Sequence, residues 1–108
     1  MIKLQKLPIE KVELITQAVK HFIEHGTVHY IHTEPGGILI SIAREYLPKL
    51  LTKINKQYPA RSNTINLLYH QAKMLEEAFS YYQATNPAHI RENNVLQMYR
   101  MELNQKLV

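Results

Sequence analysis

The sequence predicts a mainly α-helical fold, a small bundle of four or so helices in a single domain over residues 1–108. Three observations support this class. Apolar residues recur at steps of three and four along several stretches. Prolines, asparagines and glycines punctuate the chain between those stretches. Only three glycines occur in 108 residues, too few for the tight turns of an all-β fold.

The first element is a helix over residues 8–25. Pro8 suits the first position of a helix, and Gly26 suits the position just past a helix end. Between them, apolar residues separated by steps of three and four fall on one helical face: Val12, Ile15, Val19 and Phe22. We therefore expect this helix to pack that face into the core.

Residues 27–42 have two interpretations. The runs 28–32 and 38–42 alternate in a strand-like way around Pro35, Gly36 and Gly37, which is good turn chemistry for a short β-hairpin. Alternatively, Pro35 opens a helix. Because an isolated hairpin is marginally stable, we favour a loop or short hairpin to about Gly37 and then a helix. Pro48 is expected to break or kink that helix.

The strongest pattern predicts a helix over residues 63–84. The polar residues 62–64 favour a helix start. Six apolar residues then step by three and four without interruption, as in helical bundles and coiled coils. We take them as the interface core of the protein: Ile65, Leu68, Ala72, Leu75, Phe79 and Tyr82.

A last helix is expected over residues 87–106, opened by Asn86 and Pro87. The short connection predicts an antiparallel pair with the preceding helix. One face carries Leu96 and Leu103, and a looser apolar row remains for a partner. Tyrosine and arginine are common interface anchors. The predicted partner surface consists of Tyr81, Val95, Met98, Tyr99, Arg100 and Met101.

Four of the six histidines crowd into residues 21–32. His21, Glu24 and His25 match the short H-x-x-E-H pattern of inverted zinc peptidases. The match covers five residues, and Gly26 directly after it leaves no room for the usual helix. We therefore expect histidines at a helix end, where the helix dipole favours a cation, and no bound metal. His21 and His25 are the residues to test for one.

A basic stripe lies in residues 44–61, which carry a net charge of +4, equal to that of the whole chain. Lysines spaced by four and three residues fall on one side of a helix. Such a stripe attracts phosphate backbones or acidic partners, although solvated lysine faces are also common. The residues concerned are Arg44, Lys49, Lys53, Lys56 and Arg61.

The residue types that are missing exclude several chemistries. The chain has no cysteine, which removes disulfides, thiolate metal sites and cysteine nucleophiles, and it has no aspartate. No serine lies in a recognisable nucleophile context. No apolar run is long enough for a signal sequence or a membrane span. We expect neither a cofactor nor catalysis, and a cytoplasmic location.

These observations favour a small protein-binding or regulatory module that associates with itself as a homodimer. The motive is the long apolar seam over residues 65–82 together with the spare apolar row near the C-terminus. Two alternatives stay open. The first is a nucleic-acid-binding protein that uses the basic stripe. The second is a small histidine-based metal-binding protein centred on His21 and His25.

Overall fold

A computed structural model describes residues 1–30, 34–58 and 60–107. The fold is mainly α, as the sequence predicts, with four helices and two short strands among the described residues. Along the chain these elements are β1 (Ile2–Leu7), α1 (Ile9–Tyr30), α2 (Glu34–Ile54), β2 (Asn63–Leu67), α3 (Tyr69–Thr85) and α4 (Ile90–Leu107).

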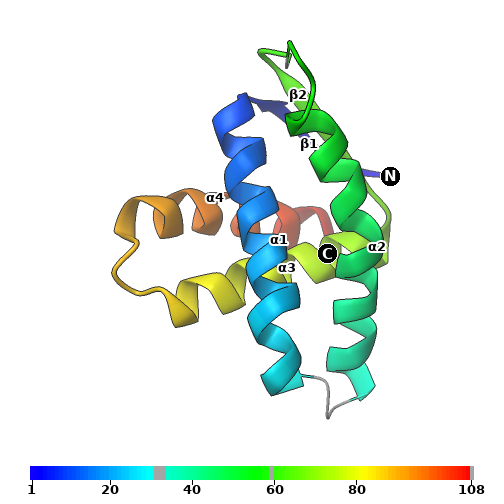
Figure 1. The fold of residues 1–108 in the computed structure, drawn as a ribbon, viewed down its shortest axis with the longest axis vertical. Coiled ribbons are helices and arrows are strands. Elements are labelled where there is room, and N and C mark those ends of the chain that lie inside the picture. The colour runs from blue at the N-terminus through cyan, green and yellow to red at the C-terminus, as the bar shows by residue number, and fades with distance from the viewer. Residues whose placement is uncertain (31–33, 59, 108) are drawn as a thin grey trace.

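The helices form two antiparallel pairs that cross each other. Helices α1 and α2 run side by side in opposite directions, and α3 and α4 form a second pair that lies across them (Figure 1). The antiparallel pairing of the last two helices confirms the prediction from their short connection. The contacts of α3 reach both α1 and α2 as well as α4, so α3 is the central element of the core.

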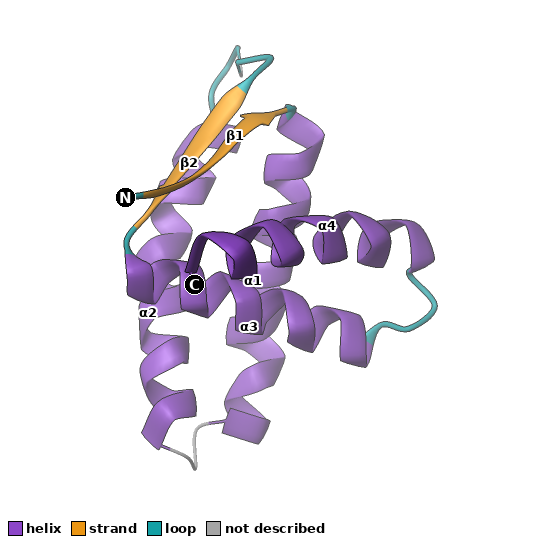
Figure 2. Cartoon of the chain, turned by 180° about the vertical axis from the view of Figure 1, so that it is seen from behind, coloured by secondary structure: helices purple, strands orange, loops and turns teal. Residues whose placement is uncertain are grey.

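The sheet joins two segments that are far apart in sequence. Strands β1 and β2 pair antiparallel, with Ile2 opposite Leu67 and Leu4 opposite Ile65. The register shifts between Leu4 and Leu7, where Lys6 has a φ of 57°, in the left-handed region. The pair lies across one end of α1 and α2 (Figure 2). It therefore closes that end of the core.

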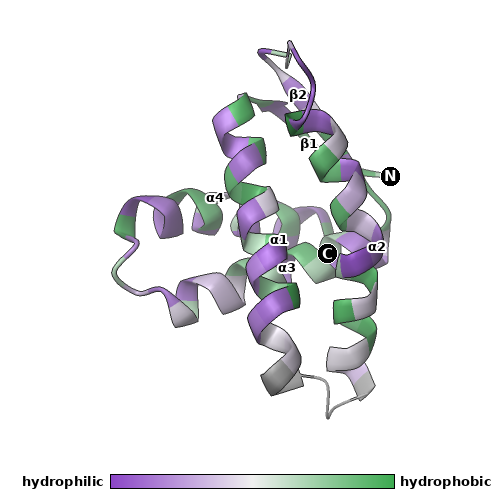
Figure 3. Ribbon diagram, viewed as in Figure 1, coloured by the Kyte–Doolittle hydropathy of each residue, from purple (hydrophilic) through white to green (hydrophobic). Residues whose placement is uncertain are grey.

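The core is built from the apolar faces that the helices turn toward one another. The four residues predicted for the first helix, from Val12 to Phe22, are all fully buried. The sheet adds one apolar side, because exposed or partly buried residues separate its buried ones. Along α1 and α2, apolar residues (green) alternate with polar ones (purple), as expected for helices with one buried face (Figure 3). The sheet residues in the core are Leu4, Leu7, Ile65 and Leu67.

The first helix is longer than predicted. Helix α1 continues through Gly26 to Tyr30, and Gly26 is buried inside it rather than ending it. A glycine within a helix costs about 1 kcal/mol relative to alanine, which tertiary packing readily offsets. Here α1 packs along α2.

The preferred interpretation of residues 27–42 is corrected. Residues 27–30 belong to α1, and α2 begins at Glu34, so both glycines after Pro35 are helical. The alternative, a helix opened at Pro35, is confirmed, since proline is tolerated in a first helical turn. Residues 31–33 lie outside the described part of the chain. Pro48 does not end the helix, which continues to Ile54.

The continuous helix predicted over residues 63–84 is wrong in its first six residues, 63–68. Residues 63–67 form strand β2, and α3 starts at Tyr69. The burial of Ile65 and Leu67 on either side of exposed Asn66 has the period of a strand. Pairing with β1 supplies the backbone partners that make this strand. The last helix begins at Ile90, three residues later than expected.

Within the described residues, no helix combines the length and apolar character that crossing a membrane requires.

Candidate functional site

An apolar groove lies on the surface between α2 and α3. It has a volume of about 420 Å³. Two large side chains beside it face solvent although they are apolar or aromatic, since Ile38 is 54% exposed and Tyr69 is 59% exposed. The groove is lined by Pro35, Ile38, Leu39, Ile42, Tyr69, His70, Lys73 and Glu77. We call this surface the α2–α3 groove.

Polar groups lie on only one side of the α2–α3 groove. All four lining residues from α2 are apolar, whereas α3 contributes Tyr69, His70, Lys73 and Glu77. The Lys73 Nζ atom lies 5.7 Å from the centroid of the Tyr69 ring, within the range of a cation–π contact. An apolar floor beside a charged edge is typical of surfaces that bind other proteins.

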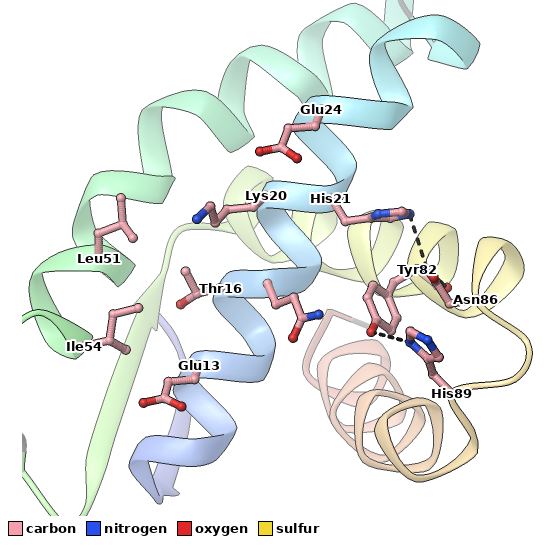
Figure 4. A pocket seen from close by; sticks show the side chains of 11 residues that line it. Glu13, Thr16, Lys20, His21, Glu24, Leu51, Ile54, Tyr82, Asn86 and His89 are labelled. Carbon is pink, nitrogen blue, oxygen red and sulfur yellow. Dashed lines mark hydrogen bonds between the residues drawn. The ribbon is translucent and has the colours of Figure 1, made fainter.

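A second, more polar opening of about 390 Å³ lies along α1 (Figure 4). On one side of it, His21 from α1 reaches the end of α3. The His21 Nε2 atom is 2.8 Å from Thr85 Oγ1 and 3.3 Å from Asn86 Nδ2. Nearby, the Tyr82 hydroxyl is 2.9 Å from His89 Nδ1. The His21 contacts fasten α1 to the C-terminal end of α3, and the Tyr82–His89 contact joins α3 to the residue before α4.

The surroundings of His21 favour its neutral form. Burial is the largest cause that lowers the pKa of His21, and the nearby His25 lowers it further, while Glu24 acts in the opposite direction. Burial and the charge of Glu92 raise the pKa of Tyr82. The side chains in this cluster are engaged with one another, so the arrangement serves to hold the helices together.

The two histidines singled out from the sequence lie together on α1. The ring centroids of His21 and His25 are 4.6 Å apart. The described residues contain no group of three histidine or glutamate side chains that could hold a metal. Thr85 at the end of α3 and Asn86 directly after it contact His21 instead. The side chain of His29 and all of His32 lie outside what the structure describes.

The predicted interface core is mostly covered by the chain itself. Its residues Ile65, Ala72, Leu75, Phe79 and Tyr82 are at most 2% exposed. Only Leu68, which precedes α3, is open to solvent, and its N–H donates to Gln71 Oε1 at 2.9 Å. These buried residues therefore fill the interior of one chain, and a partner would have to use other residues.

The predicted partner surface is divided in a similar way. Tyr81 and Tyr99 are buried, and Val95 is partly buried. Arg100 donates to Gln83 Oε1 at 3.2 Å and so links α4 to α3. The two methionines are the members that face solvent: Met98 is 53% and Met101 55% exposed.

The predicted basic stripe extends over more than one element. Arg44 and Lys49 are exposed on α2, and Lys49 Nζ lies 5.8 Å from the centroid of the Tyr46 ring. Lys53 lies in the last turn of α2. Lys56 and Arg61 are exposed in the connection between α2 and β2. The stripe therefore divides into a helical part and a part beside the sheet.

Sequence reasoning missed the α2–α3 groove. A helix started at Pro35 would have placed Ile38 and Ile42 on one face, four residues apart, so that part of the signal was available. Tyr69 carried no such signal, because it had been placed inside the longer helix over residues 63–84. Its exposure follows from the start of α3 at that residue.

Searches against protein-family models, curated proteins and solved structures found no match for this chain. The proposals below therefore depend on the chain's own geometry.

Proposed function

We propose that this chain is a small, non-enzymatic protein-binding module whose α2–α3 groove takes an apolar segment of a partner protein. The observation that carries the proposal is the exposure of Ile38 and Tyr69 beside a groove whose α2 side is entirely apolar. Burying a large aliphatic or aromatic side chain gains roughly 1.5–3 kcal/mol, so a partner that covers both gains several. The cysteine-free composition favours a cytoplasmic setting.

The chemistry of the groove also limits the partner. The apolar side formed by α2 suits aliphatic or aromatic side chains, and Lys73 and Glu77 on α3 can orient a polar flank of the same segment. A second copy of the chain is one such partner. Self-association would use this groove or the Met98–Met101 row, since the seam over residues 65–82 is largely buried within the chain.

Peptide selection with a matched surface control tests the proposal. A random peptide library is selected on the wild-type chain, with counter-selection on Ile38→Glu, which places a charge in the groove. We expect apolar peptides that bind the wild type and lose at least tenfold in affinity on Ile38→Glu. The matched control is Ile90→Glu, because Ile90 is 69% exposed and lies at the start of α4 rather than in the groove.

Sedimentation velocity of the same three proteins tests self-association. Association that Ile38→Glu abolishes and Ile90→Glu preserves supports the groove with a second copy as its occupant. The proposal is overturned if no peptide distinguishes wild type from Ile38→Glu and all three proteins sediment as monomers. Circular dichroism and urea unfolding of each variant confirm that the fold is retained.

A further inference from the structure

The positive charge of the chain is concentrated at the end of the molecule that carries the sheet. Strand β1, the last turn of α2 and the connection to β2 together hold five cations and no carboxylate: Lys3, Lys6, Lys53, Lys56 and Arg61. The rest of the chain has eight lysines and arginines against nine glutamates. These five residues therefore account for more than the whole net charge of +4. We call them the basic end.

The sheet brings these residues together from distant parts of the sequence. Lys3 pairs with Asn66 across the two strands, and both are exposed. Asn63 Nδ2 donates to the carbonyl oxygens of Leu7 at 3.1 Å and of Ala60 at 3.0 Å. Because these bonds tie residues 60–63 to the end of β1, Arg61 is held close to the strand that carries Lys3 and Lys6.

One carboxylate beside the sheet is already paired with a cation. Glu10 follows β1 in the first turn of α1 and is succeeded directly by Lys11. Glu102 forms an ion pair with Lys106 at 3.1 Å. The same Lys106 Nζ also donates a hydrogen bond to the carbonyl oxygen of Lys3. Glu102 therefore already has a cation of its own, and the five cations of the basic end outnumber Glu10 and Glu13 at the start of α1.

An exposed aromatic ring lies in the same connection. Tyr58, between Lys56 and Arg61, is 84% exposed, the most open of the large apolar and aromatic side chains described. A solvent-exposed tyrosine ring does not contribute to the core. With cations beside it, such a ring can stack on a nucleobase while the cations bind the phosphates. Duplex nucleic acid keeps its bases stacked inside and offers no such face.

We infer that the basic end binds single-stranded nucleic acid, with the five cations on the phosphate backbone and Tyr58 stacked on a base. This site is separate from the α2–α3 groove and independent of its function. It also differs from the basic stripe predicted from the sequence, because it includes Lys3, Lys6 and Tyr58 and excludes Arg44 and Lys49.

Fluorescence anisotropy with a dye-labelled oligothymidylate of about 20 nucleotides tests the inference on the full chain. The charge variant is Lys53→Gln/Lys56→Gln/Arg61→Gln. The matched control, Lys20→Gln/Lys73→Gln/Arg91→Gln, removes the same charge from exposed positions elsewhere. We expect the charge variant to lose at least tenfold in affinity at about 50 mM salt, and the slope of log K against log salt to fall by about 2, because each lost phosphate contact removes about 0.7.

The stacking contact has its own test. Tyr58→Phe keeps a ring and should bind within about twofold of wild type, whereas Tyr58→Ala should lose roughly tenfold. Since Tyr58 is exposed, neither change should alter the urea midpoint. A tenfold preference of the wild type for the single strand over the matching duplex further supports the inference.

Three results overturn it. The first is the absence of measurable binding to the oligothymidylate. The second is an equal loss of affinity in the charge variant and the matched control, which means that net charge alone attracts the strand. The third is competition by polyglutamate at the same charge concentration as the strand, which assigns the surface to an acidic protein instead.

Discussion

Helices α2 and α3 carry apolar side chains on two sides, and the two sides have different surroundings. Toward the interior, Ile40 is 2% exposed and Phe79 is fully buried. Toward the α2–α3 groove, Ile38 and Tyr69 on the same two helices are more than half exposed. The interior side of this pair therefore stabilises the fold, while the groove side is available for binding. Single substitutions should therefore distinguish the effect on stability from the effect on binding.

The largest difference is expected between Phe79→Ala and Tyr69→Ala. Removing a fully buried phenylalanine side chain costs about 3–5 kcal/mol, because the ring loses its burial and leaves a cavity. Domains of this kind have only about 5–15 kcal/mol of stability in total. Removing the exposed Tyr69 ring should change the stability by about 0.5 kcal/mol or less. Urea unfolding followed by circular dichroism measures both.

Two isoleucines make the same comparison with a gentler change, in case Phe79→Ala does not fold. Ile40→Val should cost about 0.5–1.5 kcal/mol, and Ile38→Val, two residues away, should cost almost nothing. Equal costs at the two positions would contradict the division between the interior side and the groove side.

The next effect concerns a polar contact on the interior side of α2. The Tyr46 hydroxyl donates to the carbonyl oxygen of Asn66 at 2.8 Å and so ties α2 to strand β2. Burial raises the pKa of Tyr46 to about 12, so the hydroxyl stays protonated and able to donate even at a pH above its ordinary value of 10. Tyr46→Phe keeps the ring and removes only this bond, so we expect a loss of about 1 kcal/mol in urea unfolding.

Tyr69→Phe is the matched control for Tyr46→Phe, because it removes a hydroxyl from an exposed ring on the groove side. Its urea midpoint should stay at the wild-type value. If Tyr46→Phe is equally neutral, the bond to Asn66 does not help to hold β2 in place, and the apolar residues of the sheet do so alone.

The same contrast explains what the sequence could predict. Helices α1 and α4 were found because their buried residues repeat at helical spacing, a signal that lies within the segment itself. Residues 63–67 were assigned to the wrong class because the step from Ile65 to Leu68 fits a helix, while the step from Ile65 to Leu67 fits a strand. Strand β1, some 60 residues earlier, decides between them by pairing.

The candidate sites were harder to predict than the elements. Exposure of Ile38 and Tyr69 depends on how α2 passes over α3, and the basic end depends on the pairing of β1 with β2. No local sequence pattern predicts either arrangement. The positive charge of residues 44–61 was visible in the sequence. Lys3 and Lys6 lie near part of it only because β1 pairs with β2.

A third position lies at the margin of the interior, where α1 packs on the end of α3. His21 is partly buried there beside Thr85 and Asn86. The titratable groups that act on it are His25 and Glu24 from α1 and His89 near the start of α4.

The smallest expected effect is the pH dependence that His21 gives to stability. Its pKa is lowered in the folded state from the ordinary value of 6.5, so below about pH 6.5 the unfolded chain binds the proton more readily. Stability should therefore fall as the pH drops through 6.5 toward the folded pKa. His21→Gln should make the urea midpoint less dependent on pH over that range. An unchanged slope in His21→Gln would show that protonation of His21 does not weaken the contact between α1 and α3.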